Sequence, residues 1–413
     1  TPDGPEKAYN QRLMGQLVYD QALRLIANED QDSQSQAEDL LKTSQDDLRQ
    51  GLDGMTVATP EAMQAALTLA KVHRRQGKPA DAISVLDSKE YGPLTLVGKL
   101  DPPSASFKLD LYSTELQSIV DAMVAGEGDL DKLLSRSSKA VANLNASANN
   151  PGAKAKLGNI FINIARKVEQ AIDEAGPAKK QKLIEAFRVF LSELVRATKD
   201  PVTLQWVGER LMNLAEASMP PGQAQAVGQS KDLLDLAVKT FGDLQGKVKG
   251  DRKLALEMQL ARANRLTGNY AAAINTLAEI LKEKPTMLDA QIEAALSYEQ
   301  WAGKLDPKIA VRAYKSAIMG GRPDANKKNI IWGWGRISQT INGRPQYRTQ
   351  FFDARYHLAL CRYLSGKKGN DKDAMKKAIR DIEMLETVYP DMGGKQQKAK
   401  FDALKKQIQK EAS

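Results

Sequence analysis

Apolar residues recur at helical spacing along most of this chain. Ile160, Ile164, Val168 and Ile172 follow one another every four residues, which places them on one face of a helix. A sustained alternation of β-branched and polar residues, which would indicate strands, is nearly absent. The pattern therefore predicts an all-α protein with helices of roughly 12 to 20 residues. Similar stripes that we expect to face a core are Leu13, Leu17, Ala22, Leu25 and Ile26, and Leu183, Phe187, Phe190, Leu191 and Leu194.

Short breaks that contain proline or glycine separate the helical stretches. Residues 77–79, 176–177 and 200–201 are examples. Proline is favoured in the first turn of a helix, and glycine is favoured just after the last turn. Because the breaks are short, we expect consecutive helices to pack as antiparallel pairs.

Residues 254–287 have the length and the marker residues of a known repeat. They span 34 residues and contain two predicted helices. Ala261 and Ala273 are small residues deep in these helices, Tyr270 follows the turn between them, and Pro285 ends the unit. This stretch resembles the tetratricopeptide repeat (TPR) family. The resemblance implies an α–α superhelix, or solenoid, of antiparallel helix pairs with a concave groove for a partner.

The resemblance extends to other parts of the chain in weaker form. Residues 288–319 continue the repeat, and residues 63–88 and 352–390 match it in part, the latter with a long turn at 367–372. The middle of the chain has helix pairs without the marker residues. We therefore expect four segments: N-terminal TPR-like helix pairs at 1–104, degenerate helical repeats at 105–250, C-terminal TPR repeats at 251–390 and a capping helix at 391–413.

Charge is distributed unevenly along the sequence. Residues 301–413 contain 24 Lys and Arg against 11 Asp and Glu, whereas the first 60 residues contain 5 against 11. A basic segment of this kind can steer nucleic acid or another polyanion to the protein. It can also consist of side chains that solvate exposed helix faces, and the sequence leaves both possibilities open.

Residues that carry catalysis or bind metals are scarce. The chain has one Cys and two His, which excludes a disulfide framework and a multi-Cys zinc site. His357 and Cys361 lie one helical turn apart, so they could form a thiolate–imidazole pair or two metal ligands. The alternative is packing, since the resemblance places Cys361 where TPRs have a small packing residue. Without a phosphate-binding loop, HExxH or GxSxG motif, we expect no enzyme, no cofactor and no metal.

TPR proteins bind ligands on the groove-facing side of the first helix of each pair. The resemblance carries this role to Lys71, Arg74 and Arg75 in the early repeat. Some members clamp a terminal carboxylate with Lys and Asn, but Met258 and Arg262 occupy those places here, so we expect a cationic or mixed apolar groove instead. The alternative is a solvated exposed face. The later residues with this role are Met258, Arg262, Arg265, Ile292, Leu296, Glu299, Tyr356, Leu360 and Tyr363.

A second candidate site lies at residues 329–348, where Trp332 and Trp334 stand two positions apart. Residues two apart on a helix do not share a face, so one Trp can be buried while the other is partly exposed. Exposed aromatics beside arginines are typical interface anchors and can also stack on bases. Alternatively, both tryptophans fill a gap between helix pairs. The candidate residues are Trp332, Trp334, Arg336, Arg344, Tyr347 and Arg348.

These patterns predict a scaffold that binds a protein or peptide partner in the groove of a TPR-like solenoid. Nucleic-acid or polyanion binding through the basic C-terminal third is the alternative. The mean hydropathy of −0.45 predicts no transmembrane segment in this chain. The sequence starts without Met or an apolar signal core, so a cytoplasmic and an exported location both stay open.

Overall fold

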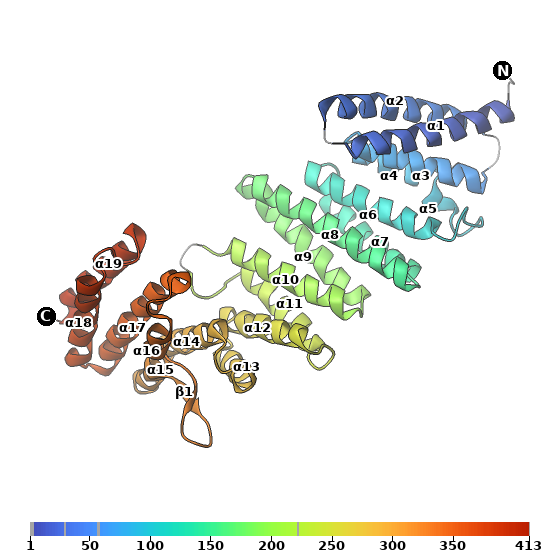
Figure 1. The fold of residues 1–413 in the computed structure, drawn as a ribbon. Helices are drawn as coiled ribbons and strands as arrows, with labels where there is room; N and C mark the ends of the chain where they lie inside the picture. The colour runs from blue at the N-terminus through green and yellow to red at the C-terminus, as the bar shows by residue number, and fades with distance from the viewer. Residues whose placement is uncertain (1–3, 29, 56–57, 221–222, 413) are drawn as a thin grey trace. The chain divides into compact units, whose positions relative to one another are not determined.

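The computed structural model describes residues 4–28, 30–55, 58–220 and 223–412. The chain divides into two compact units, Thr1–Lys199 (unit 1) and Asp200–Ser413 (unit 2). The described residues are α-helical almost throughout, and their one sheet has two strands of three residues each. The predicted all-α class is therefore confirmed (Figure 1).

Unit 1 consists of helix pairs joined by short turns. Its first helices α1, α3, α6 and α8 lie next to one another in chain order, and α2, α4, α7 and α9 are their second helices. The bounds in unit 1 are α1 (Pro5–Ile26), α2 (Gln31–Asp53), α3 (Pro60–Arg75), α4 (Pro79–Leu86), α5 (Pro93–Leu96), α6 (Phe107–Ala125), α7 (Leu130–Ser147), α8 (Pro151–Glu174) and α9 (Pro177–Ala197).

Unit 2 continues the same construction with an insertion. The second helix of each pair packs on the first helix of the next, as α11 does on α12, α13 on α14, α15 on α17 and α18 on α19. The bounds are α10 (Pro201–Ser218), α11 (Gln229–Leu244), α12 (Asp251–Leu266), α13 (Tyr270–Glu283), α14 (Leu288–Gly303), α15 (Pro307–Met319), β1 (Gly321–Pro323), β2 (Asn329–Ile331), α16 (Trp334–Ile341), the 3-10 helix η1 (Pro345–Tyr347), α17 (Arg348–Gly369), α18 (Lys372–Val388) and α19 (Lys395–Ala412).

Several helices begin where the sequence supplies a cap followed by proline. The Thr59 hydroxyl accepts a hydrogen bond from the backbone N–H of Ala62 at 3.2 Å, and Pro60 opens α3. The Asp200 carboxylate accepts from the N–H of Thr203 at 2.8 Å, and Pro201 opens α10. The backbone N–H groups of the first turn have no carbonyl partner within the helix, so a capping side-chain oxygen accepts a hydrogen bond from one of them. Proline has no backbone N–H, so at this position it leaves no donor unsatisfied.

Helix lengths depart from the prediction in two ways. Several helices exceed the expected length: α2 has 23 residues and α8 has 24. In addition, α17 runs through Gly366 to Gly369, where the sequence predicted a turn at 367–372. Asn370 then ends the helix in the left-handed conformation at φ 53°, which Asn adopts more readily than most residues.

The insertion in unit 2 is a hairpin attached to α14 by one buried side chain. In the antiparallel pair β1–β2, Gly321 lies opposite Ile331. The fully buried Gln291 amide donates to the Ile330 carbonyl at 3.1 Å and accepts from the Trp332 N–H at 2.6 Å. These hydrogen bonds fix the hairpin on the stack without a long strand pairing.

No helix among the described residues is long and apolar enough to cross a membrane.

The packing around two helical glycines of unit 2 predicts opposite effects when each is replaced by alanine. A Cβ at Gly208 of α10 would overlap the ring of the fully buried Phe241 of α11, whereas one at Gly242 would meet nothing. We expect Gly208→Ala to lower the free energy of unfolding by about 1–3 kcal/mol through overpacking. Gly242→Ala should raise it by about 0.5–1 kcal/mol, because alanine loses less backbone entropy in a helix. Urea unfolding of both variants measures the difference, and equal effects would contradict the close packing of α10 on α11.

Candidate functional site

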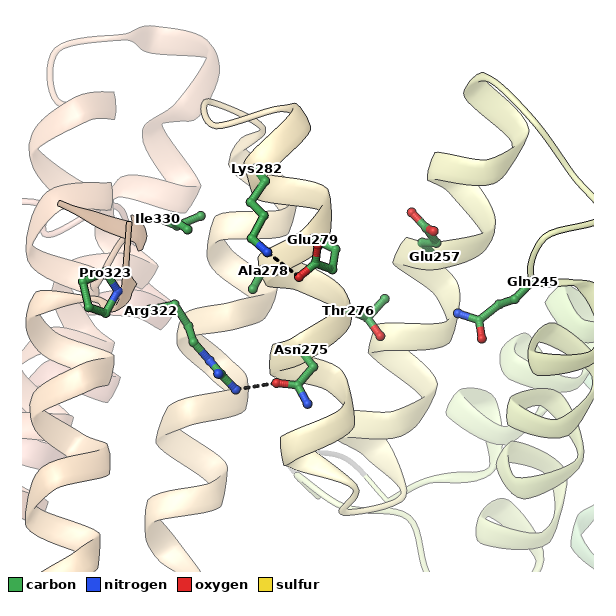
Figure 2. Close-up of a pocket in the computed structure, with 10 residues that line it drawn as sticks. All are labelled: Gln245, Glu257, Asn275, Thr276, Ala278, Glu279, Lys282, Arg322, Pro323 and Ile330. Carbon is green, nitrogen blue, oxygen red and sulfur yellow. Dashed lines mark hydrogen bonds and ion pairs between the residues drawn. The ribbon is translucent and has the colours of Figure 1, made fainter. Parts of the chain in front are cut away.

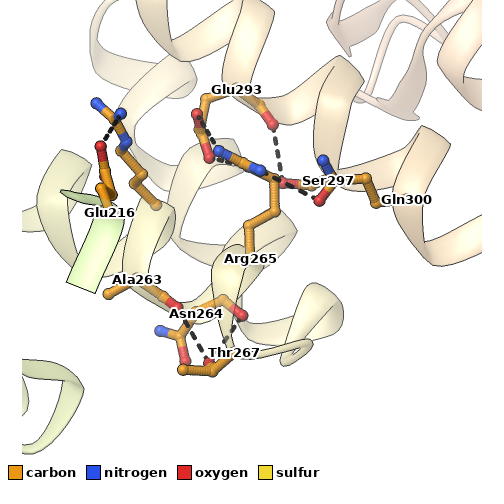
Figure 3. Close-up of polar contacts among 9 residues, drawn as sticks. Glu216, Ala263, Asn264, Arg265, Thr267, Glu293, Ser297 and Gln300 are labelled. Carbon is orange, nitrogen blue, oxygen red and sulfur yellow. Dashed lines mark hydrogen bonds and ion pairs between the residues drawn. The ribbon is translucent and has the colours of Figure 1, made fainter. Parts of the chain in front are cut away.

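Polar side chains cross between the first helices of unit 2. Arg262 of α12 pairs with Glu216 of α10 at 2.7 Å, and Arg265 pairs with Glu293 of α14. The Arg265 guanidinium also donates to the Gln300 side chain at 3.1 Å. Figure 3 shows Glu293 and Gln300 approaching Arg265 from the next helix. The two arginines thus link three consecutive first helices.

The two ion pairs differ greatly in exposure. The side chains of Arg265 and Glu293 are 8% and 11% exposed, whereas those of Arg262 and Glu216 are 48% and 32% exposed. A buried charge needs its partner because water cannot replace it, while an exposed pair contributes little. Arg265 was predicted to face a partner in the groove, but the structure buries it against Glu293. Arg262 is on the surface and is engaged by Glu216.

The other predicted groove residues of unit 2 are mostly part of the wall itself. Tyr363 is only 1% exposed, and its hydroxyl accepts from the Gln407 amide of α19 at 3.0 Å, so it is not on the surface as predicted. The half-buried residues that pack against the core of unit 2 are Met258, Ile292, Leu296, Tyr356 and Leu360.

Glu299 of α14 collects three side chains. It accepts from the Trp334 indole N–H at 3.0 Å, from the Cys361 thiol at 3.2 Å and from His357 Nδ1 at 2.9 Å. The Trp334 and His357 rings stack with centroids 4.8 Å apart. This Glu299 cluster (Glu299, Trp334, His357 and Cys361) joins α14, α16 and α17.

The geometry of the Glu299 cluster differs from that of an activated thiol. Burial, and then the Glu299 carboxylate, raise the pKa of Cys361 well above its ordinary value, so the thiol stays protonated. Burial lowers the pKa of His357, but Glu299 outweighs burial and the net pKa is raised. Glu299, not the thiol, is the hydrogen-bond partner of His357 Nδ1. Within the described residues, no group of three or more His, Cys, Asp or Glu side chains could hold a metal ion.

The predicted cations of unit 1 have different surroundings. Arg74 of α3 donates to Gln117 at 2.6 Å and to Asp121 at 3.2 Å, both on α6. Arg75 is exposed. Lys71 is half-buried without an ion-pair partner among the described residues, and burial lowers its pKa.

A cavity of about 430 Å³ opens between α1 and α3 in unit 1. Tyr9, Leu13 and Gln16 of α1 line it together with Gln64 and Ala65 of α3. Tyr9 and Leu13, with Leu17 one turn further on, form an apolar row that is 49–56% exposed. Leu13 and Leu17 were expected to face the core, and this was wrong. The residues of α1 that pack inward are Ala8, Gly15, Tyr19 and Ala22.

The tryptophan segment is largely internal. Trp332 and Trp334 are 7% and 2% exposed, so of the two possibilities the structure has the one in which both are packed inside, and neither is an exposed interface anchor. The reason is local: Trp332 lies between β2 and α16, and only Trp334 is helical. Arg336 stacks over the Trp332 ring at 4.7 Å. Of the remaining candidates, Arg348 pairs with Asp391, Tyr347 is half-buried and Arg344 is exposed.

A second cavity, of about 590 Å³, lies where the hairpin approaches α13. Figure 2 shows Arg322 of the hairpin reaching Asn275 of α13, with Lys282 paired to Glu279. Glu257, on the far wall, pairs with Lys253 at 3.8 Å. This cavity could not be predicted from the sequence, because strands of three residues leave no alternating pattern. Its carboxylates are already paired, so it offers no free acidic group to a ligand.

Comparison with known proteins leaves the function to be argued from the side chains. No family model matches the chain, and no curated protein matches it either. One solved structure, a circular tandem repeat protein with novel repeat topology and enhanced subunit contact surfaces, aligns with 99% of this chain and 97% of its own. The identity is 11% and the TM-score is 0.30, which is too low to carry a functional argument.

Removing the two arginines of α12 should have unequal effects. Arg265→Met leaves Glu293 buried without a partner, so we expect the free energy of unfolding to fall by about 3–5 kcal/mol. Arg262→Met removes an exposed pair and should cost less than about 1 kcal/mol. Chemical denaturation of both variants measures this. Arg265→Met combined with Glu293→Met should recover most of the loss, and a double variant no more stable than Arg265→Met would contradict the buried pair.

The two histidines should titrate on opposite sides of their ordinary pKa of 6.5. Burial lowers the pKa of His73, whereas Glu299 raises that of His357. Because the folded pKa of His357 is raised, the stability that it contributes is present below pH 6.5 and is lost as the pH rises through the folded pKa. Proton NMR of the two imidazole rings, assigned with His73→Gln, checks both midpoints. A midpoint for His357 below 6.5 would show that Glu299 does not hold the charged ring.

Proposed function

We propose that this chain is a non-enzymatic TPR-type scaffold that binds a protein or peptide partner on the first-helix face of unit 1. The observation that carries the proposal is the exposed apolar row of Tyr9, Leu13 and Leu17 beside the α1–α3 cavity. Contiguous exposed apolar side chains on a first helix are typical of a binding surface.

The chemistry of this face suits an amphipathic segment. The apolar row repeats every four residues, so a partner helix can lay its own apolar stripe along it. Gln16, which lines the cavity, and Thr68 hydrogen-bond to each other and so join α1 to α3. Lys71 follows on α3, half-buried and without an ion-pair partner among the described residues. A carboxylate on the partner would satisfy it.

The TPR assignment is supported by the packing of the marker residues. Ala261 and Ala273 have no exposed surface, and Tyr270 is 5% exposed. Gly268 makes the turn between α12 and α13 with φ at 87°, a conformation that favours glycine. A turn of this kind and two small residues allow α12 and α13 to approach closely.

The non-enzymatic part of the proposal is supported by the Glu299 cluster. Its Cys is the single Cys of the chain, and this thiol stays protonated, because burial and then the Glu299 carboxylate that accepts its hydrogen bond raise its pKa. A catalytic cysteine requires the opposite, a lowered pKa that leaves it as a thiolate. The cluster instead fastens three helices.

A photoreactive amino acid at position 17 tests the proposal. In cell extract we expect a discrete covalent adduct, since this position lies at the edge of the apolar row. Excess unlabelled protein should abolish the adduct by competition, and excess Leu13→Asp should not. Met14→Asp is the matched control, because Met14 is 54% exposed on the same helix but does not line the cavity. Circular dichroism verifies that both variants fold, and equal competition by Leu13→Asp and the unlabelled protein would refute this site.

A further inference from the structure

A short sequence pattern recurs on two second helices of unit 2. Residues 308–312 read Lys-Ile-Ala-Val-Arg in α15, and residues 376–380 read Lys-Lys-Ala-Ile-Arg in α18. The central alanine of each, Ala310 or Ala378, is fully buried, and the Lys and Arg on either side are exposed. Because α15 packs on α17 as α18 packs on α19, the two patterns occupy equivalent positions in the stack.

The cations of these patterns are unpaired. Lys308, Arg312, Lys376 and Arg380 have no ion-pair partner among the described residues. Some lysines of α17 and α19 in the same basic segment are paired, as Lys367 is with Glu411 and Lys405 is with Glu383, whereas Lys395, Lys400, Lys406 and Lys410 of α19 have no ion-pair partner among the described residues. What distinguishes α15 and α18 is that both cations of the repeated pattern are free on each helix.

The hairpin supplies a further cation at the corresponding place of α13. The buried Ala273 of α13 corresponds to the central alanine of the pattern, but no charged residue lies two positions before or after it. Asn275 follows Ala273 by two residues, as Arg312 follows Ala310 and Arg380 follows Ala378. The Arg322 guanidinium donates to the Asn275 side chain. Three consecutive second helices thus each carry a guanidinium at an equivalent position.

Large aliphatic side chains lie beside these cations. Met319 follows Lys315 by four residues on the same face of α15, and Met384 and Val388 follow Arg380 on α18. They are 65%, 65% and 62% exposed, and Ile309 within the first pattern is 52% exposed. None of the large exposed apolar residues described in unit 2 is aromatic.

We propose that this second-helix face of α15 and α18 docks on an anionic lipid surface. Unpaired Lys and Arg side chains attract acidic headgroups, and exposed aliphatic side chains insert between acyl chains. A nucleic acid would engage the cations but would leave Met319, Met384 and Val388 in water, and single strands are usually held by stacking on aromatics. Three of the four acids on α18 are already paired, Asp381 with Arg362, Glu383 with Lys405 and Glu386 with Lys398, so Asp373 alone opposes the attraction on this helix.

Vesicle cosedimentation tests the proposal with the full chain. We expect binding to vesicles of equimolar phosphatidylglycerol and phosphatidylcholine, no binding to phosphatidylcholine alone, and weaker binding as salt screens the charges. The variant Lys308→Gln, Arg312→Gln, Lys376→Gln and Arg380→Gln should bind more than about a hundredfold more weakly, at roughly fivefold for each cation removed. The matched control neutralises four exposed lysines of unit 1 (Lys108→Gln, Lys139→Gln, Lys154→Gln and Lys156→Gln) and should bind like the unaltered protein.

A second variant separates lipid from nucleic acid. Met319→Ser with Met384→Ser and Val388→Ser keeps every charge, so it should weaken vesicle binding several-fold and leave any binding to duplex DNA unchanged. Unaltered circular dichroism shows that each variant folds. The proposal is overturned by a lack of binding to anionic vesicles at low salt, or by equal binding of the four-cation variant and its control. It is also overturned if duplex DNA binds more tightly than vesicles and the aliphatic variant binds vesicles normally.

Discussion

The fold depends on one constraint: a helix pair has more apolar surface than it can bury by itself. In unit 2 the second helix of each pair covers the first helix of the next, and alanines such as Ala261, Ala294 and Ala310 have no exposed surface at these contacts. Because alanine keeps the backbones close, the interface fills with small side chains and leaves few voids. The hairpin and α16 are accommodated in the connection between α15 and α17, which still pack together. The stack thus tolerates an insertion that does not separate its neighbouring helices.

Stacking also determines where polar side chains find partners. First helices of successive pairs lie near one another, so long side chains on one can reach the next, as Arg265 reaches Glu293 and His357 reaches Glu299. Each of these two contacts is local to one junction, and the carboxylate in each is largely buried. The side chains on the first-helix face of unit 2 are therefore largely used in contacts within the protein, and few are free to bind a partner. In unit 1 the face differs, because the apolar row on α1 is about half exposed.

The sequence predicts the helices well and the roles of individual surface residues poorly. Periodicity and short breaks suffice for an all-α fold of helix pairs, since both are local properties of the chain. Leu13 and Leu17 satisfy the same periodicity as a buried stripe, yet α1 buries the neighbouring stripe of Ala8, Gly15, Tyr19 and Ala22. Small residues in this stripe allow close contact with α2. Which stripe of α1 is buried therefore depends on the shape of α2, which the periodicity of α1 does not contain. For Trp332 and Trp334 periodicity left two possibilities open, because the backbone around them is not one continuous helix and its path could not be predicted.

The charge of the basic segment can be interpreted only when the ion-pair partners of its Lys and Arg side chains are known. A count of Lys and Arg cannot separate a solvated helix face from a recognition surface, because both have the same composition. Pairing separates them: a cation that already has a carboxylate has less to gain from an anionic ligand, and it must first lose that contact. On α17 and α19 several cations are paired across helices, whereas those of the Lys-x-Ala-x-Arg patterns on α15 and α18 are not. Within each pattern the Lys and the Arg are four residues apart on one helix face, where like charges repel each other, so these unpaired cations lower the stability of the isolated protein. An anionic surface that spans both helices would relieve this repulsion at every position at once, which is why the repeated pattern favours an extended ligand over a single small anion.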